Sequence, residues 1–241
     1  MSGPAAIVVP AVRRHTSTVI VAHGLGDSGA GWSFLSEQWR RQNKFPETKF
    51  IFPNAPTIPI TINMGMKMPG WYDIVRPRDI AVSFDALQES EDEPGIKRAQ
   101  DYFHGLIAKE IEAGIPSERI VLGGFSQGGA MSLISGVTSP VRLGGIFGLS
   151  SYLLLKGKIR DMVPKENPNK DTVIFMGHGD MDPVVRYEWG QQTAAKLKEW
   201  GWNVDFNTYG GLPHSAAPEE INDLEKYLKA RIPDQGDKGA L

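Results

Sequence analysis

One short stretch of the sequence combines a nucleophile with unusual backbone freedom. Residues 123–129 read GGFSQGG, with Ser126 among four glycines, directly after the apolar run RIVL. Glycine costs backbone entropy and adds no packing, so this density indicates a turn too tight for side chains. The pattern G-x-S-x-G is typical of a nucleophile elbow, which holds a serine on a strained strand-to-helix turn. The alternative is a glycine-rich turn with no catalytic role. To decide between the two, the other residues of a catalytic triad must be found in the sequence.

A serine hydroxyl becomes a useful nucleophile when a histidine accepts its proton and a carboxylate orients that histidine. The chain has five histidines. His15 precedes the first predicted strand, His104 lies within a predicted helix, and His23 precedes a glycine turn where it could support the site structurally. His178 is too close in sequence to the candidate acids. We therefore predict His214, in the loop GGLPH, as the base.

Two aspartates could supply the carboxylate. Asp180 and Asp182 both follow the apolar stretch TVIFMGHG, whereas Asp171 begins that stretch and belongs to the opposite sheet edge. Pro183 makes the turn after Asp182 rigid, which favours Asp182 but leaves Asp180 open. The chain order serine, aspartate, histidine is the order of α/β-hydrolases.

Acyl transfer also requires hydrogen-bond donors for an oxyanion. The amide of Gln127, directly after the candidate nucleophile, lies at the N-terminus of a predicted helix whose dipole favours negative charge. The amide of Leu25, in the loop HGLGD after TVIVA, is the second candidate. A phosphate loop is disfavoured because the segment lacks the G-x-x-x-x-G-K-[ST] pattern and the spaced third glycine of a dinucleotide fingerprint.

These loops are expected at one edge of a mostly parallel sheet flanked by helices, where carboxyl ends of strands meet. Short β-branched runs alternate with longer amphipathic stretches, which is typical of βαβ units. The predicted strands are Thr18–Ala22, Lys49–Phe52, Arg119–Gly123, Gly145–Leu149, Thr172–Met176 and Val204–Thr208. The predicted helices are Gly31–Arg41, Ile96–Ala113, Gly128–Ser135, Arg186–Trp200 and Pro218–Ala230. We expect a single α/β-hydrolase domain over residues 1–232 and a polar, fraying tail over 233–241.

Composition narrows the function classes. The 241 residues carry a formal net charge of −2, which gives no reason to expect a nucleic-acid partner. The absence of cysteine excludes disulfides, thiolate metal sites and a cysteine nucleophile. No residue cluster has metal-ligand spacing, so we expect neither metal nor cofactor. The sequence shows no signal peptide, no long apolar run and no lipidation motif, so we expect no stable membrane anchor. We expect a cytoplasmic location, with the nucleus as a second possibility.

Assembled along the chain, these residues resemble the acyl-protein thioesterase and phospholipase–carboxylesterase family. The matching segments are VIVAHGLGDSGAGW, FPNAPTIPITINMGMKMPGWYDI, GGFSQGGAMSL, HGDMDPVV and YGGLPHS. The resemblance implies Ser126 as nucleophile, Asp182 as acid, His214 as base, and Leu25 and Gln127 as oxyanion donors. It also implies S-acylated proteins or small acyl esters as substrates. Some members are S-acylated near the N-terminus, which this chain cannot be. The sequence does not indicate an oligomeric state.

The segment before Trp71 has an alternating apolar pattern. Ile60, Ile62, Met64, Met66 and Met68 occupy every second position, which predicts one strand with an apolar face. This face either covers the core or lines an adaptable acyl groove, and the resemblance favours the groove. The candidate groove residues are Ile62, Met64, Met66, Met68, Trp71 and Leu154, although the Leu153–Leu155 run is more consistent with buried core.

Three functions remain in view. The best-supported prediction is a serine hydrolase that removes fatty acyl groups from protein cysteines and cleaves acyl esters. A general carboxylesterase or lysophospholipase without a protein substrate is the first alternative. A non-catalytic lipid- or protein-binding module is the second, and it would have no use for a complete triad.

Overall fold

The computed structural model describes residues 3–75 and 91–236, and a central sheet organises these residues. Its seven strands follow the order β1-β3-β2-β6-β7-β8-β9. Strand β1 pairs antiparallel with β3, and the remaining pairs are parallel. The strands are β1 Ile7–Val9, β2 Ser17–Ala22, β3 Thr48–Phe52, β6 Ile120–Phe125, β7 Gly145–Leu149, β8 Ile174–Gly179 and β9 Val204–Tyr209.

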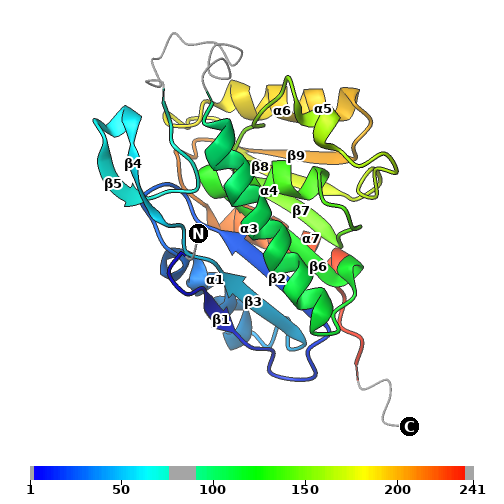
Figure 1. Ribbon diagram of the computed structural model, residues 1–241. Coiled ribbons are helices and arrows are strands. Elements are labelled where there is room, and N and C mark those ends of the chain that lie inside the picture. Colours follow the sequence, from blue (N-terminus) through cyan, green and yellow to red (C-terminus); the bar gives the residue numbers. More distant parts are fainter. Residues whose placement is uncertain (1–2, 76–90, 237–241) are drawn as a thin grey trace.

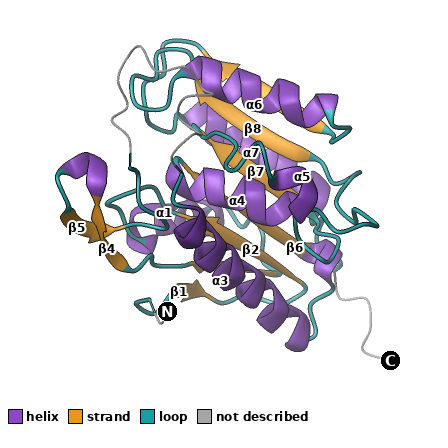
Figure 2. Ribbon diagram, turned by 45° about the horizontal axis from the view of Figure 1, so that its top comes forward, coloured by secondary structure: helices purple, strands orange, loops and turns teal. Residues whose placement is uncertain are grey.

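Helices cover both faces of this sheet (Figures 1 and 2). Helices α3, α4 and α6 pack on one face and α1 and α7 on the other. Their bounds are α1 Gly29–Arg41, α3 Glu93–Glu112, α4 Gln127–Val137, α5 Ile159–Met162, α6 Tyr187–Glu199 and α7 Pro218–Arg231. Two 3-10 turns span Thr61–Asn63 and Ser117–Arg119. None of the helices in the described ranges is long and apolar enough to cross a membrane.

The burial of both sheet faces explains why the central strands are continuously apolar. In β2, Ile20 and Ala22 enter the core cluster under α3 and α4, and Val19 and Val21 enter the cluster under α1 and α7. Successive side chains of a strand point to opposite faces, so a strand buried on both sides needs apolar residues at every position. The six predicted strands and five predicted helices are confirmed, with ends shifted by a few residues.

A two-stranded antiparallel hairpin stands apart from the main sheet (Figure 1). Strand β4, Thr57–Ile60, pairs with β5, Met66–Pro69. The predicted single strand from Ile60 to Met68 is therefore wrong. The chain reverses through the 3-10 turn and through Met64 and Gly65, which both have positive φ, 56° and 73°. Apolar alternation did not reveal this turn because it continues through both arms of the hairpin.

The start of the polar tail is held against the body of the protein. The amides of Gln235 and Gly236 donate to the Glu47 carboxylate over 2.9 and 2.8 Å, and Arg119 donates to the Pro233 carbonyl over 2.9 Å. We expected the tail to fray from residue 233 onward, and for residues 233–236 this expectation is wrong. Residues 237–241 lie outside the described part of the chain.

Candidate active site

The loop between β6 and α4 holds Ser126 in a conformation that L-residues rarely adopt. Its φ is 53° and its ψ is −121°. The glycines on either side allow this turn, because a Cβ atom on Gly124 or Gly128 would lie 2.4 or 2.3 Å from the carbonyl oxygen of Ala22. Strand β6, helix α4 and strand β2 therefore meet too closely for any side chain at these two positions. The strained backbone of Ser126 and the close packing at the flanking glycines are the features of a nucleophile elbow.

Three side chains from three separate loops converge at the carboxyl edge of the sheet. His214 Nε2 lies 3.0 Å from Ser126 Oγ, and His214 Nδ1 lies 2.7 Å from Asp182 Oδ2. Strands β8 and β9 bring the last two together, because Gly179 and Tyr209 at the strand ends are direct partners in the ladder. These distances permit a proton to pass from the serine hydroxyl to the imidazole while the carboxylate fixes the tautomer.

Asp182 is a buried carboxylate whose charge the surrounding structure stabilises. Its burial by itself raises the pKa, but hydrogen bonds from His214 and from the amides of Val184 and Val185 hold the pKa below its ordinary value. The two amides donate to Oδ1 over 2.8 and 2.9 Å, which leaves Oδ2 for His214. Asp182 is therefore ionised and aimed at His214 across the neutral pH range.

Two titratable neighbours of Asp182, His178 and Glu220, are neutral near pH 7. Burial lowers the pKa of His178, whose Nε2 donates to the Val185 carbonyl and lies 3.6 Å from Asp182 Oδ2. Burial raises the pKa of Glu220 to about 8, and the nearby Asp182 charge adds to the shift. The negative charge beside His214 is thus carried by Asp182.

Asp180 has a different task from Asp182. Its Oδ1 accepts a hydrogen bond of 2.6 Å from the Gly211 amide, in the loop that carries His214. The sequence left the two aspartates as alternatives because both follow β8. The structure brings Asp182 to the imidazole and leaves Asp180 to brace the neighbouring loop.

His23 is a structural residue of the site, as the sequence suggested. It is fully buried, its Nδ1 donates to the Gly24 carbonyl over 2.7 Å, and its Nε2 accepts from the Ala55 amide over 3.1 Å. Burial lowers its pKa, so the ring is neutral. His15 bonds to Thr18 Oγ1 and His104 to the Ser135 carbonyl, so neither reaches Ser126.

Two backbone amides beside Ser126 are available for an oxyanion. Within the described residues, no acceptor pairs with the amides of Leu25 or Gln127. Their neighbours are paired: Gly26 donates to the Pro69 carbonyl over 2.8 Å, and Ser126 donates to the Leu149 carbonyl over 2.9 Å. The two open donors are those that the sequence singled out.

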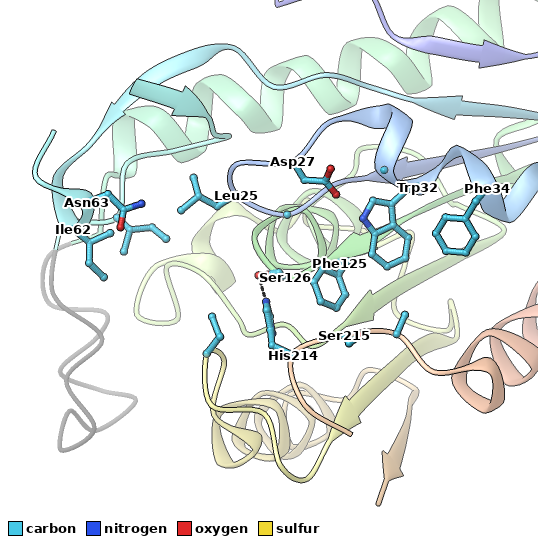
Figure 3. A pocket seen from close by; sticks show the side chains of 15 residues that line it. Leu25, Asp27, Trp32, Phe34, Ile62, Asn63, Phe125, Ser126, His214 and Ser215 are labelled. Carbon is cyan, nitrogen blue, oxygen red and sulfur yellow. Dashed lines mark hydrogen bonds between the residues drawn. The ribbon is translucent and has the colours of Figure 1, made fainter. Parts of the chain in front are cut away.

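A cavity of about 580 Å³ opens over Ser126 and His214. Figure 3 shows Leu25, Ile62 and Asn63 on one side of Ser126, and Trp32 and Phe34 on the other. This volume suits a small-molecule or acyl-chain site. Within the described residues, no group of three histidine, aspartate or glutamate side chains could hold a metal ion.

The cavity includes one of the six candidate groove residues. Ile62 lines it, whereas Met64 and Met66, 93% and 58% exposed, stand on the outside of the hairpin. Met68 is half-buried, and its sulfur accepts a hydrogen bond of 3.3 Å from the side-chain Nδ2 of Asn63. The proposed methionine face does not form in the structure, because the chain reversal at Met64 and Gly65 divides it.

Trp71 and Leu154 do not line the cavity either. Trp71 is buried and serves as an anchor: its amide donates to Gln127 Oε1 and its indole Nε1 to the His23 carbonyl, each over 2.8 Å. The Gln127 side chain also donates to the Tyr72 carbonyl over 2.8 Å. These bonds tie the base of the hairpin to the elbow. Leu154 is fully buried in the core, the second of its two predicted alternatives.

Several residues that line the cavity were not predicted from the sequence. Trp32 and Phe34 come from the first turns of α1, directly after the HGLGD loop, and Phe125 precedes the nucleophile with its ring 4.7 Å from that of His214. The proximity of GAGWSF to the HGLGD loop was an available signal. Ile74 and Asn63 offered none, because the hairpin that positions them was not predicted.

The fold and the site define a hydrolase of the α/β-hydrolase class. Residues 4–232 match the model of a family described as phospholipase/carboxylesterase. Acyl-protein thioesterase 1 of Neurospora crassa is 57% identical over 96% of this chain and 94% of its own length. The protein of that name from Emericella nidulans is 54% identical over 95% and 96%. The chain belongs to the phospholipase/carboxylesterase family.

Solved structures agree with this placement. The crystal structure of Zea mays acyl-protein thioesterase 2 superposes with a TM-score of 0.83, at 30% identity, over 96% of this chain and 100% of that one. Arabidopsis thaliana SOBER1 superposes with a TM-score of 0.80, at 32% identity, over 90% and 99%.

Proposed function

We propose that this protein is a serine hydrolase that removes acyl groups from thioester-linked cysteines of proteins and that also accepts acyl esters. The observation that carries the catalytic part is the continuous hydrogen-bonded path from Ser126 Oγ through His214 to Asp182 inside the cavity. The substrate class is supported by relatives named acyl-protein thioesterase at up to 57% identity.

In the first half-reaction Ser126 is the nucleophile. Its Oγ attacks the thioester carbonyl carbon while His214 Nε2 takes the hydroxyl proton. The carbonyl oxygen becomes an oxyanion, which the amides of Leu25 and Gln127 stabilise. The C–S bond then breaks, the acyl group remains on Ser126 as an ester, and the proton on His214 passes to the departing cysteine sulfur.

In the second half-reaction the same groups act on water. His214 removes a proton from a water molecule that attacks the acyl ester, and the oxyanion again faces the two amides. Collapse of the intermediate breaks the ester bond, returns the proton to Ser126 Oγ and releases the fatty acid. Asp182 stabilises the positively charged imidazolium in both halves.

The acyl chain fits the side of the cavity bounded by Leu25, Ile62 and Ile74. Each methylene that leaves water for such a surface contributes about 0.8 kcal/mol. We therefore expect kcat/KM to rise by up to roughly fifteenfold for every two carbons until the cavity is full.

The family also includes carboxylesterases in its description, so an ester-only activity is the competing proposal. A matched pair of peptides separates the two: one bears an S-palmitoyl cysteine and the other an O-palmitoyl serine at the same position. We expect kcat/KM for the thioester to equal or exceed that for the ester. Cleavage of the ester peptide and of p-nitrophenyl esters without cleavage of the thioester would show a carboxylesterase instead.

A further inference from the structure

The side of the cavity formed by α1 differs in chemistry from the acyl side. Trp32, Phe34 and Phe125 present aromatic rings there, with ring centroids 6.0 Å apart for Trp32 and Phe34 and 5.0 Å apart for Trp32 and Phe125. Phe34 is 42% exposed although it is a large apolar residue in the first turns of a helix. Asp27 lies beside these rings at the cavity wall (Figure 3). We call Asp27, Trp32, Phe34 and Phe125 the α1 subsite.

The electrostatics of the cavity favour a cation. Among the described residues that line it, Asp27 is the one acidic side chain, and neither lysine nor arginine is present. Asp182, behind His214, adds a second negative charge close to the cavity. Aromatic faces attract cations through their quadrupole, so rings and carboxylate act in the same direction.

The hydrogen bonding of Asp27 engages one of its two carboxylate oxygens. Oδ1 accepts a hydrogen bond of 2.7 Å from the Ser28 amide at the start of α1. The carboxylate lies over Gly31, where a Cβ atom would come within 2.3 Å of Oδ1 and 2.5 Å of Oδ2. Within the described residues, Oδ2 has no hydrogen-bond partner. Capping the start of α1 explains the hydrogen bond to Oδ1, but it explains neither the unpaired Oδ2 nor the exposure of the Phe34 ring.

From this arrangement we infer that the α1 subsite binds a basic side chain, lysine or arginine, of the peptide that carries the acylated cysteine. The inference rests on the proposed function, because it assigns the leaving-group side of the same site. A neutral alkyl chain gains nothing from Asp27 and would have to desolvate it. The acyl chain therefore lies against Leu25, Ile62 and Ile74, and the peptide leaves past α1.

The test compares S-palmitoyl peptides that differ at one residue near the cysteine. Lysine is compared with acetyl-lysine, which keeps the length without the charge, and with norleucine. Each is placed in turn at the two positions on either side of the cysteine. Cation–π and exposed ion-pair contacts are individually weak, so at the best position we expect the lysine peptide to exceed both others roughly five- to twenty-fold in kcat/KM. The ratio should fall as salt increases.

Variants assign the preference to the subsite. Asp27→Asn keeps an acceptor for the Ser28 amide but removes the charge, so the lysine-to-acetyl-lysine ratio should fall to within about twofold of one. Phe34→Leu removes an exposed ring and should lower the ratio about two- to fourfold. Glu37→Gln is the matched control: it removes one charge from the same helix, outside the cavity, and should leave the ratio unchanged. Melting temperatures show whether each variant is folded.

The outcomes separate this inference from the proposed function. Equal hydrolysis of all three peptides, or a lysine preference that survives Asp27→Asn, overturns the α1 subsite and leaves the thioesterase proposal standing. Absence of thioester hydrolysis overturns both. A preference for lysophosphatidylcholine over lysolipids whose headgroups carry no cationic group, without a lysine preference among peptides, shows that the cation is a lipid headgroup and overturns the peptide assignment.

Discussion

Ser126 combines backbone strain with firm anchoring. A positive φ at a residue with a side chain costs on the order of 1–3 kcal/mol, so its neighbours must hold it in place. Its amide donates to the Leu149 carbonyl and its carbonyl accepts from the Ala130 amide, each over 2.9 Å. The hydroxyl is therefore presented to His214 on a rigid turn, and the energy of folding offsets the strain.

The division of labour between the two aspartates gives a prediction at this scale. Asp182→Asn should lower kcat by on the order of 10⁴, because an amide cannot stabilise the imidazolium or select the correct tautomer. Asp180→Asn should change kcat by less than about threefold, since an asparagine oxygen can still accept from the Gly211 amide. Steady-state kinetics on one ester substrate, with melting temperatures of both variants, checks this. Equal losses of kcat in equally stable variants would contradict the assignment.

The catalytic residues differ in how well the sequence alone could predict them. Ser126 and His214 could be predicted because the glycine pattern and the elimination of four other histidines both point to single residues. Asp180 and Asp182 could not be separated by position, since both follow β8 and differ in which loop they reach. The amides of Val184 and Val185, which fix Asp182, depend on a turn geometry that the sequence only hints at through Pro183.

Among the secondary-structure elements, the elbow could be predicted from the sequence and the hairpin could not. The helices and strands around Ser126 follow from local periodicity, and the glycines mark where they meet. The hairpin β4–β5 does not follow from local periodicity, because apolar residues alternate in the same way along one long strand and along two paired short strands. The reversal at Met64 and Gly65 carries no proline and no asparagine–glycine pair. As a result, the methionine groove was predicted where the structure has an exposed hairpin end.

The packing of α7 on β8 buries Glu220, and this has a consequence for stability. Glu220 is fully buried against Gly177, and neither carboxylate oxygen has a hydrogen-bond partner among the described residues. Its folded pKa of about 8 lies above the ordinary 4.5. Between these values the folded chain keeps a proton that the unfolded chain has lost, so stability falls as pH rises, by at most about 1.4 kcal/mol per pH unit.

Glu220→Gln should remove this loss. The variant should melt at a higher temperature than the wild type at pH 8, and the difference should shrink toward pH 5. Glu91, whose burial also raises its pKa to about 8, is present in both proteins and cancels in the comparison. Glu219→Gln, at the exposed neighbouring position, is the control and should follow the wild type. A difference between wild type and Glu220→Gln that does not change with pH would show that Glu220 is ionised in the fold.

At the scale of the whole molecule, the sheet order explains why one site can collect residues so far apart in sequence. Strand β2 lies between β3 and β6, so the chain turns away from β2 in one direction and later returns on its other side. Ligand sites of parallel sheets form at such switch points, outside the carboxyl ends of the strands. His23 and Leu25 follow β2, Ser126 follows β6, and the loops after β8 and β9 complete the set.

The central claim is that Ser126 carries the acyl group during turnover. The most direct test mixes the protein with an S-palmitoyl peptide, quenches the reaction in acid within milliseconds, and maps the covalent adduct by mass spectrometry of proteolytic fragments. We predict one palmitoyl group per chain, located on Ser126, and none on the Ser126→Ala variant, whose thioester turnover should fall to a residual roughly 10³–10⁴-fold above the uncatalysed rate. An adduct on another residue, or thioester turnover by Ser126→Ala at the wild-type rate, would contradict the account.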